Sequence, residues 1–257
     1  MGYLETLVLV IVEGVTEFLP VSSTGHLILT SHILKIPQTE FLKSFEIIIQ
    51  LGAILAVVVL YWRRLLTDFE SLKRILLAFI PSAVLGFIFY DFIKGVLFEN
   101  ILVTVTALFL GGVAFILLEK FYFKEDRGLD DVNKLSYKKL LLIGIFQAIS
   151  MIPGVSRAGS TIFGGLFAGL SRKTAVEFSF LLAVPTMMAA TGLDILETNL
   201  NYSLSELGML GVGLLGSFIV ALLVIKWFLK YIQSHTFIAF GVYRIILAIV
   251  FYLFFLY

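Results

Sequence analysis

The segment Phe18–Gly25 has the sequence FLPVSSTG and the segment Ile152–Gly159 has the sequence IPGVSRAG, and these two short stretches decide the fold. Each lies in the middle of a long apolar stretch, Leu4–Lys35 in the first case and Leu140–Leu170 in the second. Proline, glycine and serine at the centre of an apolar helix favour a break, because proline removes a backbone donor and obstructs the preceding turn. Each stretch therefore predicts a hairpin of two helices joined by a break.

The two breaks also resemble each other. Aligning Ser22 with Ser156 places a glycine on a glycine three positions later, and it places Ser23 opposite Arg157. Self-similarity of this kind indicates an internal repeat. Two breaks in register, rich in hydroxyl groups and charge, favour a functional site over a simple proline kink, because irregular backbone inside a membrane must be satisfied by protein or water.

The remaining apolar sequence predicts membrane-spanning helices. The chain has 257 residues, of which 60% are hydrophobic and only 14% charged, and its mean hydropathy is +1.03. A helix needs about 20 apolar residues to cross a bilayer. Six runs of roughly that length are expected to do so, near residues 45–62, 75–93, 100–120, 174–195, 207–227 and 237–256.

These elements predict an all-α integral membrane protein built from two repeats, residues 1–123 and 140–257, joined by a cytoplasmic loop at 124–139. Each repeat is expected to hold a re-entrant hairpin, at 3–35 or 140–170, followed by three transmembrane helices. Because three spans follow each hairpin, the second repeat should have inverted topology. Inverted repeats whose broken helices meet inside the membrane typically form a binding site between the halves.

Loop charges give the expected orientation. The segments Arg63–Arg74 and Lys124–Lys139 are rich in basic residues, which favours the cytoplasm, whereas Glu197–Glu206 has acids and no bases and is expected outside, as are both termini. The net charge of +1 gives no indication of a nucleic-acid partner. The chain has no cysteine, which excludes disulfides, thiolate metal sites and cysteine nucleophiles.

Glu13 and Glu17 are the first candidates for chemistry. They lie one helical turn apart, so their carboxylates share a face. Burying two like charges is costly unless a cation or a shared proton compensates. A divalent cation with hard oxygen ligands, Mg²⁺ or Ca²⁺, is the simplest compensation. The alternative is a solvated surface pair, which the apolar flanks disfavour.

The helix that must begin after Pro20 is a candidate anion site. Its first backbone N–H groups lack helical partners, and Ser22, Ser23 and Thr24 add hydroxyls. Ser156 and Arg157 stand at the equivalent helix start in the second hairpin. Helix N-termini and an arginine are suited to binding phosphate.

His26 comes one turn after the first break, close enough to relay protons or to attack phosphorus. The alternative is a core histidine bonded to a backbone carbonyl. For Arg157, the alternative is an internal salt bridge with Glu13 or Glu17. Arg244, inside an apolar span, is as compatible with helix–helix bonding as with function.

At this point a family resemblance is clear. Glu13–His26, with the sequence EGVTEFLPVSSTGH, and Pro153–Thr161, with the sequence PGVSRAGST, resemble the two signature motifs of the undecaprenyl-pyrophosphate phosphatase family of the bacitracin-resistance type. Phe45–Gly52 and Glu177–Pro185 resemble its other recurrent stretches, so the resemblance covers nearly the whole chain. The resemblance implies hydrolysis of a C55 polyprenyl diphosphate to the monophosphate, which recycles the lipid carrier of cell-wall synthesis. It also implies a plasma-membrane protein whose site opens to the extracytoplasmic face.

By motif position, the resemblance assigns roles to individual residues. The family often has serine where this chain has Ala158 and alanine where it has Ser160, which leaves open which hydroxyl assists Arg157. Independently, Thr174 and Glu177 have the spacing of a capping box, which favours a structural role for Glu177. The candidate residues are: catalytic, His26, Ser23, Glu17, Glu13 and Arg157; substrate-binding, Ser22, Thr24, Gly25, Ser156, Arg157 and Thr161; and metal-ligating, Glu13 and Glu17.

A second hypothesis is a secondary transporter or flippase for a lipid phosphate or another anion, because inverted repeats with broken helices are typical of transporters. The grouping of His26, Ser23 and a carboxylate pair favours hydrolysis, since binding and release of an intact anion need fewer reactive side chains. A covalent phosphoserine, a phosphohistidine and direct attack by water all remain open. The oligomeric state is open as well, with a homodimer among the options.

Overall fold

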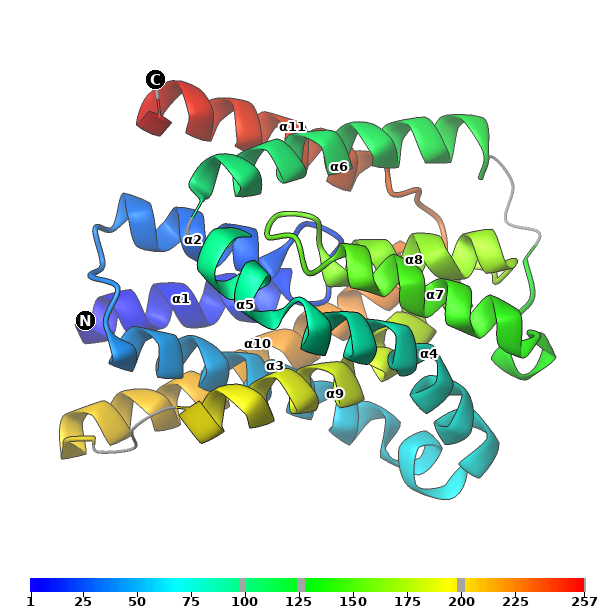
Figure 1. The fold of residues 1–257 in the computed structure, drawn as a ribbon, viewed down its shortest axis with the longest axis horizontal. Coiled ribbons are helices and arrows are strands. Elements are labelled where there is room, and N and C mark those ends of the chain that lie inside the picture. The colour runs from blue at the N-terminus through cyan, green and yellow to red at the C-terminus, as the bar shows by residue number, and fades with distance from the viewer. Residues whose placement is uncertain (98–99, 124–127, 198–201, 257) are drawn as a thin grey trace.

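A computed structural model describes residues 1–97, 100–123, 128–197 and 202–256 of the protein (Figure 1). The described residues form helices joined by short turns, and no strand occurs among them beyond one isolated bridge between Leu129 and Leu170. The helices are α1 (Tyr3–Thr16), α2 (Ser23–Ile33), α3 (Glu40–Thr67), α4 (Phe69–Ile88), α5 (Tyr90–Phe92), α6 (Ile101–Phe121), α7 (Tyr137–Ile149), α8 (Arg157–Ala168), α9 (Arg172–Glu197), α10 (Leu204–Tyr231) and α11 (Ile238–Phe251), with π-helical turns at Ile93–Leu97 and Tyr252–Leu256 and a 3₁₀ turn at Val132–Lys134.

Six of the described helices are long and apolar enough to cross a membrane. They are α3, α4, α6, α9 over Arg172–Gly192, α10, and α11 together with the π turn that ends at Leu256. The expected number of spans and the all-helical membrane class are therefore confirmed. The protein is a multi-pass membrane protein.

Two helix pairs are interrupted where the sequence predicted breaks. Residues 17–22 separate α1 from α2, and residues 150–156 separate α7 from α8. The last residue of each break, Ser22 or Ser156, has a positive φ, 74° and 82° respectively. A residue with a Cβ rarely adopts such a φ, and the strain costs about 1–3 kcal/mol that the surrounding packing must offset.

Each of these serines begins the helix that follows it. The Ser22 hydroxyl oxygen accepts a hydrogen bond from the Gly25 N–H at 3.3 Å, and the Ser156 hydroxyl oxygen accepts one from the Gly159 N–H at 3.1 Å. These are N-cap bonds, which satisfy a donor that the helix itself leaves free. The two breaks thus have the same local construction, although their sequences share few residues.

The two hairpins lie between two groups of long helices (Figure 1). On one side α6 packs along α11, and α2 contacts α6. On the other side α3 packs on α9 and α10, while α1 contacts α10 and α8 contacts α9. This arrangement buries the first break, whereas Ile152 of the second break is exposed. Phe18 of the first break is fully buried with its ring edge-on to Phe180 of α9 at 5.2 Å.

The start of α9 corrects one prediction. Thr174 lies inside the helix, and its N–H donates to the Ser171 hydroxyl at 3.4 Å, so Ser171 is the capping residue. Glu177 instead accepts from Arg64 of α3 at 3.3 Å. The capping box expected from Thr174 and Glu177 is wrong, because a suitable cap stood three residues earlier in the chain.

Candidate active site

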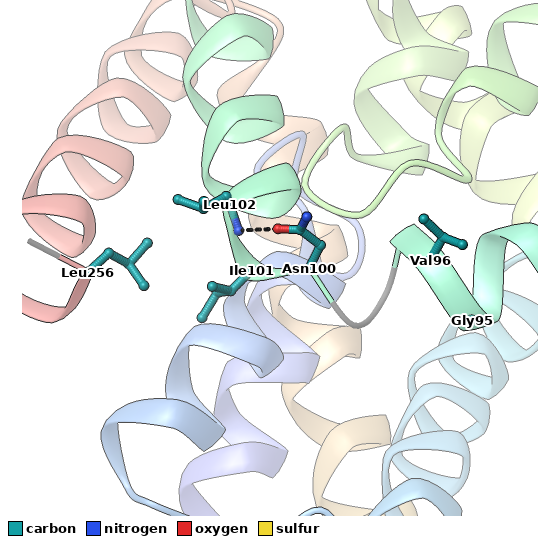
Figure 2. A pocket seen from close by; sticks show the side chains of 6 residues that line it. All are labelled: Gly95, Val96, Asn100, Ile101, Leu102 and Leu256. Carbon is teal, nitrogen blue, oxygen red and sulfur yellow. Dashed lines mark hydrogen bonds between the residues drawn. The ribbon is translucent and has the colours of Figure 1, made fainter.

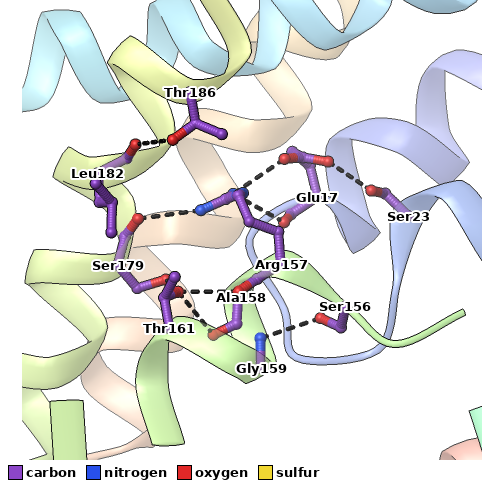
Figure 3. A network of polar contacts seen from close by, with 10 residues as sticks. All are labelled: Glu17, Ser23, Ser156, Arg157, Ala158, Gly159, Thr161, Ser179, Leu182 and Thr186. Carbon is purple, nitrogen blue, oxygen red and sulfur yellow. Dashed lines mark hydrogen bonds and ion pairs between the residues drawn. The ribbon is translucent and has the colours of Figure 1, made fainter. Parts of the chain in front are cut away.

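The Glu17 carboxylate joins the two breaks (Figure 3). Glu17 directly follows α1, and its Oε2 accepts a hydrogen bond of 2.5 Å from the hydroxyl of Ser23, the first residue of α2. Its Oε1 accepts a hydrogen bond of 3.0 Å from the Arg157 guanidinium at the start of α8. All three side chains are largely buried. A hydroxyl, a carboxylate and a guanidinium therefore form one chain of bonds between the halves of the protein.

Arg157 is held in place by contacts on several sides. Besides the ion pair with Glu17, it donates to the backbone carbonyl of Ser179 in α9 at 3.0 Å, and its guanidinium lies 5.7 Å from the centre of the Phe18 ring. Its Nε is buried and has no partner among the described residues. The internal salt bridge considered from the sequence exists, and it still leaves the arginine with a buried N–H able to donate to a further group.

Thr161, expected to bind phosphate, makes its described contacts within the protein. Its hydroxyl donates to the carbonyl of Arg157 at 2.9 Å and lies 2.6 Å from the hydroxyl of Ser179 (Figure 3). The residue is fully buried. These bonds hold α8 against α9 and so help to place Arg157, while contact with a phosphate stays a prediction.

The helix starts bring further polar groups to the two breaks. The backbone N–H groups of Ser23 and Thr24 lie in the first turn of α2, before the first N–H that bonds within the helix. The N–H of Arg157 has the same position at the start of α8. Gly25 and Ser156 belong to the N-cap bonds already described. Two positive helix ends and a guanidinium thus lie around one carboxylate and one hydroxyl, an arrangement able to bind an anion.

His26 makes its hydrogen bonds outside this network. Its Nδ1 lies 2.7 Å from the Ser22 carbonyl oxygen, and its Nε2 lies 2.7 Å from the hydroxyl of Tyr243 in α11. Among the described residues it has no hydrogen bond to Ser23 or Glu17. The contact with a backbone carbonyl, considered as the alternative for His26, is present, whereas the contact with Tyr243 could not be predicted from the sequence.

Glu13 lies one turn before Glu17 and is 0% exposed, and both of its carboxylate oxygens lack a hydrogen-bond partner among the described residues. A buried carboxylate without partners is costly unless a cation or a proton compensates it. No group of three or more histidine, cysteine, aspartate or glutamate side chains that could hold a metal ion occurs in the described part of the chain. The carboxylate pair of Glu13 and Glu17 fits an ion such as Mg²⁺ that retains water and phosphate ligands.

Arg244 of α11 is a residue whose role the sequence did not reveal. It is 0% exposed and lies 4.9 Å from the centre of the Phe115 ring. A Cβ on Gly111 of α6 would stand 2.1 Å from the Arg244 guanidinium and would displace it. Its nitrogens donate to the backbone carbonyls of Pro20 at 3.3 Å, Gly154 at 2.8 Å, Val155 at 2.9 Å, Ala107 at 3.2 Å and Leu108 at 3.3 Å.

Those carbonyls belong to both breaks and to α6, so one side chain ties the two breaks to the bundle. At Pro20, Gly154 and Val155 the buried arginine satisfies break carbonyls that no helix satisfies. The signal in the sequence was a lone arginine in an apolar span without an acidic residue one turn away, which indicates partners elsewhere in the fold.

A cavity of about 490 Å³ lies elsewhere, near the start of α6 (Figure 2). It contains none of the candidate site residues. Asn100 caps α6 there by accepting from the N–H of Leu102 at 3.0 Å. The cavity is lined by Gly95, Val96, Asn100, Ile101, Leu102 and Leu256.

Comparisons with known proteins agree over nearly the whole chain. The family model described as "Bacitracin resistance protein BacA" matches residues 6–250. A protein of Aquifex aeolicus named undecaprenyl-diphosphatase is 53% identical over 253 residues, which is 98% of each chain. Proteins of the same name from a Sulfurihydrogenibium species and from Methanococcus aeolicus are 52% and 42% identical, over 98% and 99% of this chain and 99% of each relative.

Proposed function

This chain belongs to the bacitracin resistance protein BacA family, and on that premise we propose that it hydrolyses undecaprenyl diphosphate to undecaprenyl phosphate and inorganic phosphate. Relatives matching nearly their full length are named for this activity. The observation that supports the proposal most strongly is the hydrogen-bond network from Ser23 through Glu17 to Arg157. The protein is thus a membrane phosphatase that returns the lipid carrier of cell-wall synthesis to use, and bacitracin resistance follows from the family's name.

In the first step, the Ser23 oxygen attacks the terminal phosphorus of the diphosphate. A bond forms between Oγ and phosphorus, and the bond from phosphorus to the bridging oxygen breaks. The Ser23 proton passes to Glu17, which accepts its hydrogen bond at 2.5 Å. The lipid monophosphate leaves as an anion and needs no proton.

In the second step, water attacks the phosphoserine on the same phosphorus. The new bond joins the water oxygen to phosphorus, and the bond to Ser23 breaks. Glu17 returns its proton to the serine oxygen, and both protons of the water remain with the released phosphate, which leaves as H₂PO₄⁻. Arg157 and the N–H groups at the two helix starts donate to the phosphoryl oxygens in both steps. Groups already in position therefore stabilise the negative charge of the phosphoryl group.

A divalent cation, Mg²⁺ or Ca²⁺, would be held by Glu13 and Glu17. The two partnerless oxygens of Glu13 support this assignment, because a buried bare carboxylate requires compensation. Such an ion would neutralise charge on the diphosphate and stabilise the monophosphate that leaves. Arg157 and Ser23 already use both oxygens of Glu17, so Glu13 is the principal ligand in this proposal.

The packing of the helices supports an inverted repeat with re-entrant hairpins. If α1, α3 and α4 correspond to α7, α9 and α10, the contact of α1 with α10 has its counterpart in α7 with α4. The contact of α3 with α10 has its counterpart in α9 with α4. The shared N-cap and positive φ at Ser22 and Ser156 belong to the same correspondence.

In this topology the basic segments around Arg63 and Lys134 face the cytoplasm, and the start of α10 and both termini face outside. Thr198, in the predicted outer loop, lies outside the described residues, as do residues 124–127 of the predicted cytoplasmic loop. The site then opens to the extracytoplasmic face of the plasma membrane.

Release of inorganic phosphate from undecaprenyl diphosphate by the purified protein in detergent tests the function. A phosphatase releases one phosphate per lipid diphosphate. A transporter or flippase would bind the lipid and leave it intact. The repeat architecture alone suits either protein, whereas the hydrogen bond from the Ser23 hydroxyl to the Glu17 carboxylate favours the phosphatase.

A further inference from the structure

The unexpected contact of His26 is with Tyr243. The Tyr243 hydroxyl lies 2.7 Å from His26 Nε2, and the two rings stack with centres 5.6 Å apart and planes 5° from parallel. The opposite ring nitrogen, Nδ1, lies 2.7 Å from the Ser22 carbonyl oxygen. Tyr243 comes from α11, 217 positions away in the sequence, so the contact joins the first break to the last helix.

The chemistry of the two partners fixes the proton on the ring. A carbonyl oxygen can only accept, so the Nδ1 facing Ser22 must bear hydrogen. In a neutral imidazole the other nitrogen is then an acceptor, and the Tyr243 hydroxyl is the donor that matches it. Both ring nitrogens of His26 are engaged, and neither has a hydrogen bond to Ser23 or Glu17 among the described residues.

The residue to which His26 donates is a strained one. Ser22 has φ 74° and ψ 92°, and it caps the helix whose first residue is Ser23. A displaced Ser22 carbonyl would move the backbone that presents the Ser23 hydroxyl to Glu17. The imidazole therefore supports the break at the Ser22 carbonyl, as Arg244 does at the Pro20 carbonyl.

We propose that Tyr243 is a positioning residue: by donating to Nε2 it holds His26 in its Nδ1–H form against the Ser22 carbonyl, and so fixes the break that presents Ser23. His26 then acts through Ser22 and is not the phosphate acceptor, because a phosphohistidine needs a ring nitrogen that no other group occupies. The role in turnover rests on the phosphatase function proposed above, while the proton arrangement on the ring does not.

Nitrogen-15 NMR of histidine-labelled protein in detergent tests the arrangement directly. The chain has three histidines, and a His26→Gln variant identifies the signals of this one. We expect a protonated Nδ1 and an unprotonated Nε2. Tyr243→Phe should shift the Nε2 signal, whereas Tyr252→Phe should not. Tyr252 is 45% exposed, as Tyr243 is, and its hydroxyl has no hydrogen bond to the described residues. A protonated Nε2 with a bare Nδ1, or an unchanged signal in Tyr243→Phe, overturns the proposal.

Kinetics test the role in turnover. Tyr243→Phe should lower kcat by roughly two- to tenfold, the range for one lost hydrogen bond, with KM little changed, and Tyr252→Phe should leave both unchanged. His26→Asn keeps an N–H donor at the place of Nδ1, so it should retain clearly more activity than His26→Ala. Equal and complete inactivity of both His26 variants contradicts the positioning role and makes the imidazole itself the reacting group.

The two levels of the proposal fail separately. If wild-type protein releases no phosphate while the NMR result is as expected, the phosphatase function is wrong and the contact stands. If wild-type protein is active while the ring has the opposite proton arrangement, the function stands and the role of Tyr243 is wrong.

Discussion

Ser23 donates a hydrogen bond of 2.5 Å to Glu17 across the break between α1 and α2. No regular helix brings residues six positions apart into this contact, so the break itself creates it. The pair resembles a nucleophile with its base, and the Glu17 oxygen that remains is held by Arg157.

Replacement of Ser23 by alanine should therefore abolish phosphate release, with at least about a thousandfold loss of kcat, while leaving the fold intact. Ser31→Ala is a matched control, because Ser31 is also buried in α2 and has no hydrogen-bond partner among the described residues. Substantial activity in Ser23→Ala would exclude the phosphoserine pathway.

Arg157→Lys keeps the charge but loses the planar fork that reaches Glu17 and the Ser179 carbonyl together. We expect kcat/KM for undecaprenyl diphosphate to fall on the order of a hundredfold, because a lysine cannot reproduce bidentate contacts. Arg63→Lys, at an exposed position, serves as the control. Nearly normal turnover in Arg157→Lys would mean that the arginine only holds the fold.

Removal of the divalent cation with a chelator should stop hydrolysis, and Mg²⁺ or Ca²⁺ should restore it. Glu13→Gln should lower turnover and raise the metal concentration required. In metal-free buffer the same variant should unfold at a higher temperature than wild type, since it removes a buried carboxylate without partners. Full activity in chelator with Glu13 intact would refute the metal role.

The double variant Glu13→Gln with Glu17→Gln should be little worse than the poorer single variant, because the two carboxylates act on one ion.

Arg244→Met should destabilise the protein and reduce activity, although Arg244 is not part of the hydrogen-bond network around Glu17. The carbonyls of Gly154 and Val155 would lose a donor, and each buried carbonyl left unpaired costs about 1–3 kcal/mol. We expect a clear drop in the unfolding temperature in detergent and a loss of kcat, with Arg63→Met unchanged. An Arg244→Met protein as stable and active as wild type would contradict the role assigned to Arg244.

The orientation in the membrane can be tested on the natural background of a chain without cysteine. Ser205→Cys lies at the start of α10 and Asn133→Cys lies in the turn before α7, and both positions are exposed. In intact cells a membrane-impermeant maleimide should label Ser205→Cys and should label Asn133→Cys only after permeabilisation. Labelling of both from the same side would exclude the inverted repeat.

Much of the fold could be predicted from the sequence because the bilayer imposes simple conditions. Long apolar runs must be helices whose backbone is satisfied internally, and a proline and serine cluster inside such a run must mark a break. The same reasoning identified Glu17, Ser23 and Arg157, since polar groups at depth require partners. The helix ends were less certain, and the cap at Ser171 displaced the one expected at Thr174.

What the sequence could not predict are contacts between distant segments. His26 meets Tyr243, and Arg244 meets Pro20, Gly154 and Val155, only because α11 packs beside α6 and both breaks. Local periodicity describes one helix at a time and contains no information about which helix a given face will meet. A lone buried arginine indicates that partners exist, and only the assembled fold shows which carbonyls they are.

The stereochemical course at phosphorus tests the central claim most directly. The substrate is a lipid diphosphate whose terminal phosphorus is a thiophosphate made chiral with oxygen isotopes. Attack by Ser23 followed by attack of water on the phosphoserine consists of two in-line displacements, so the released thiophosphate should show retention of configuration. Inversion would mean that water attacks the diphosphate directly, and it would contradict the nucleophilic role of Ser23.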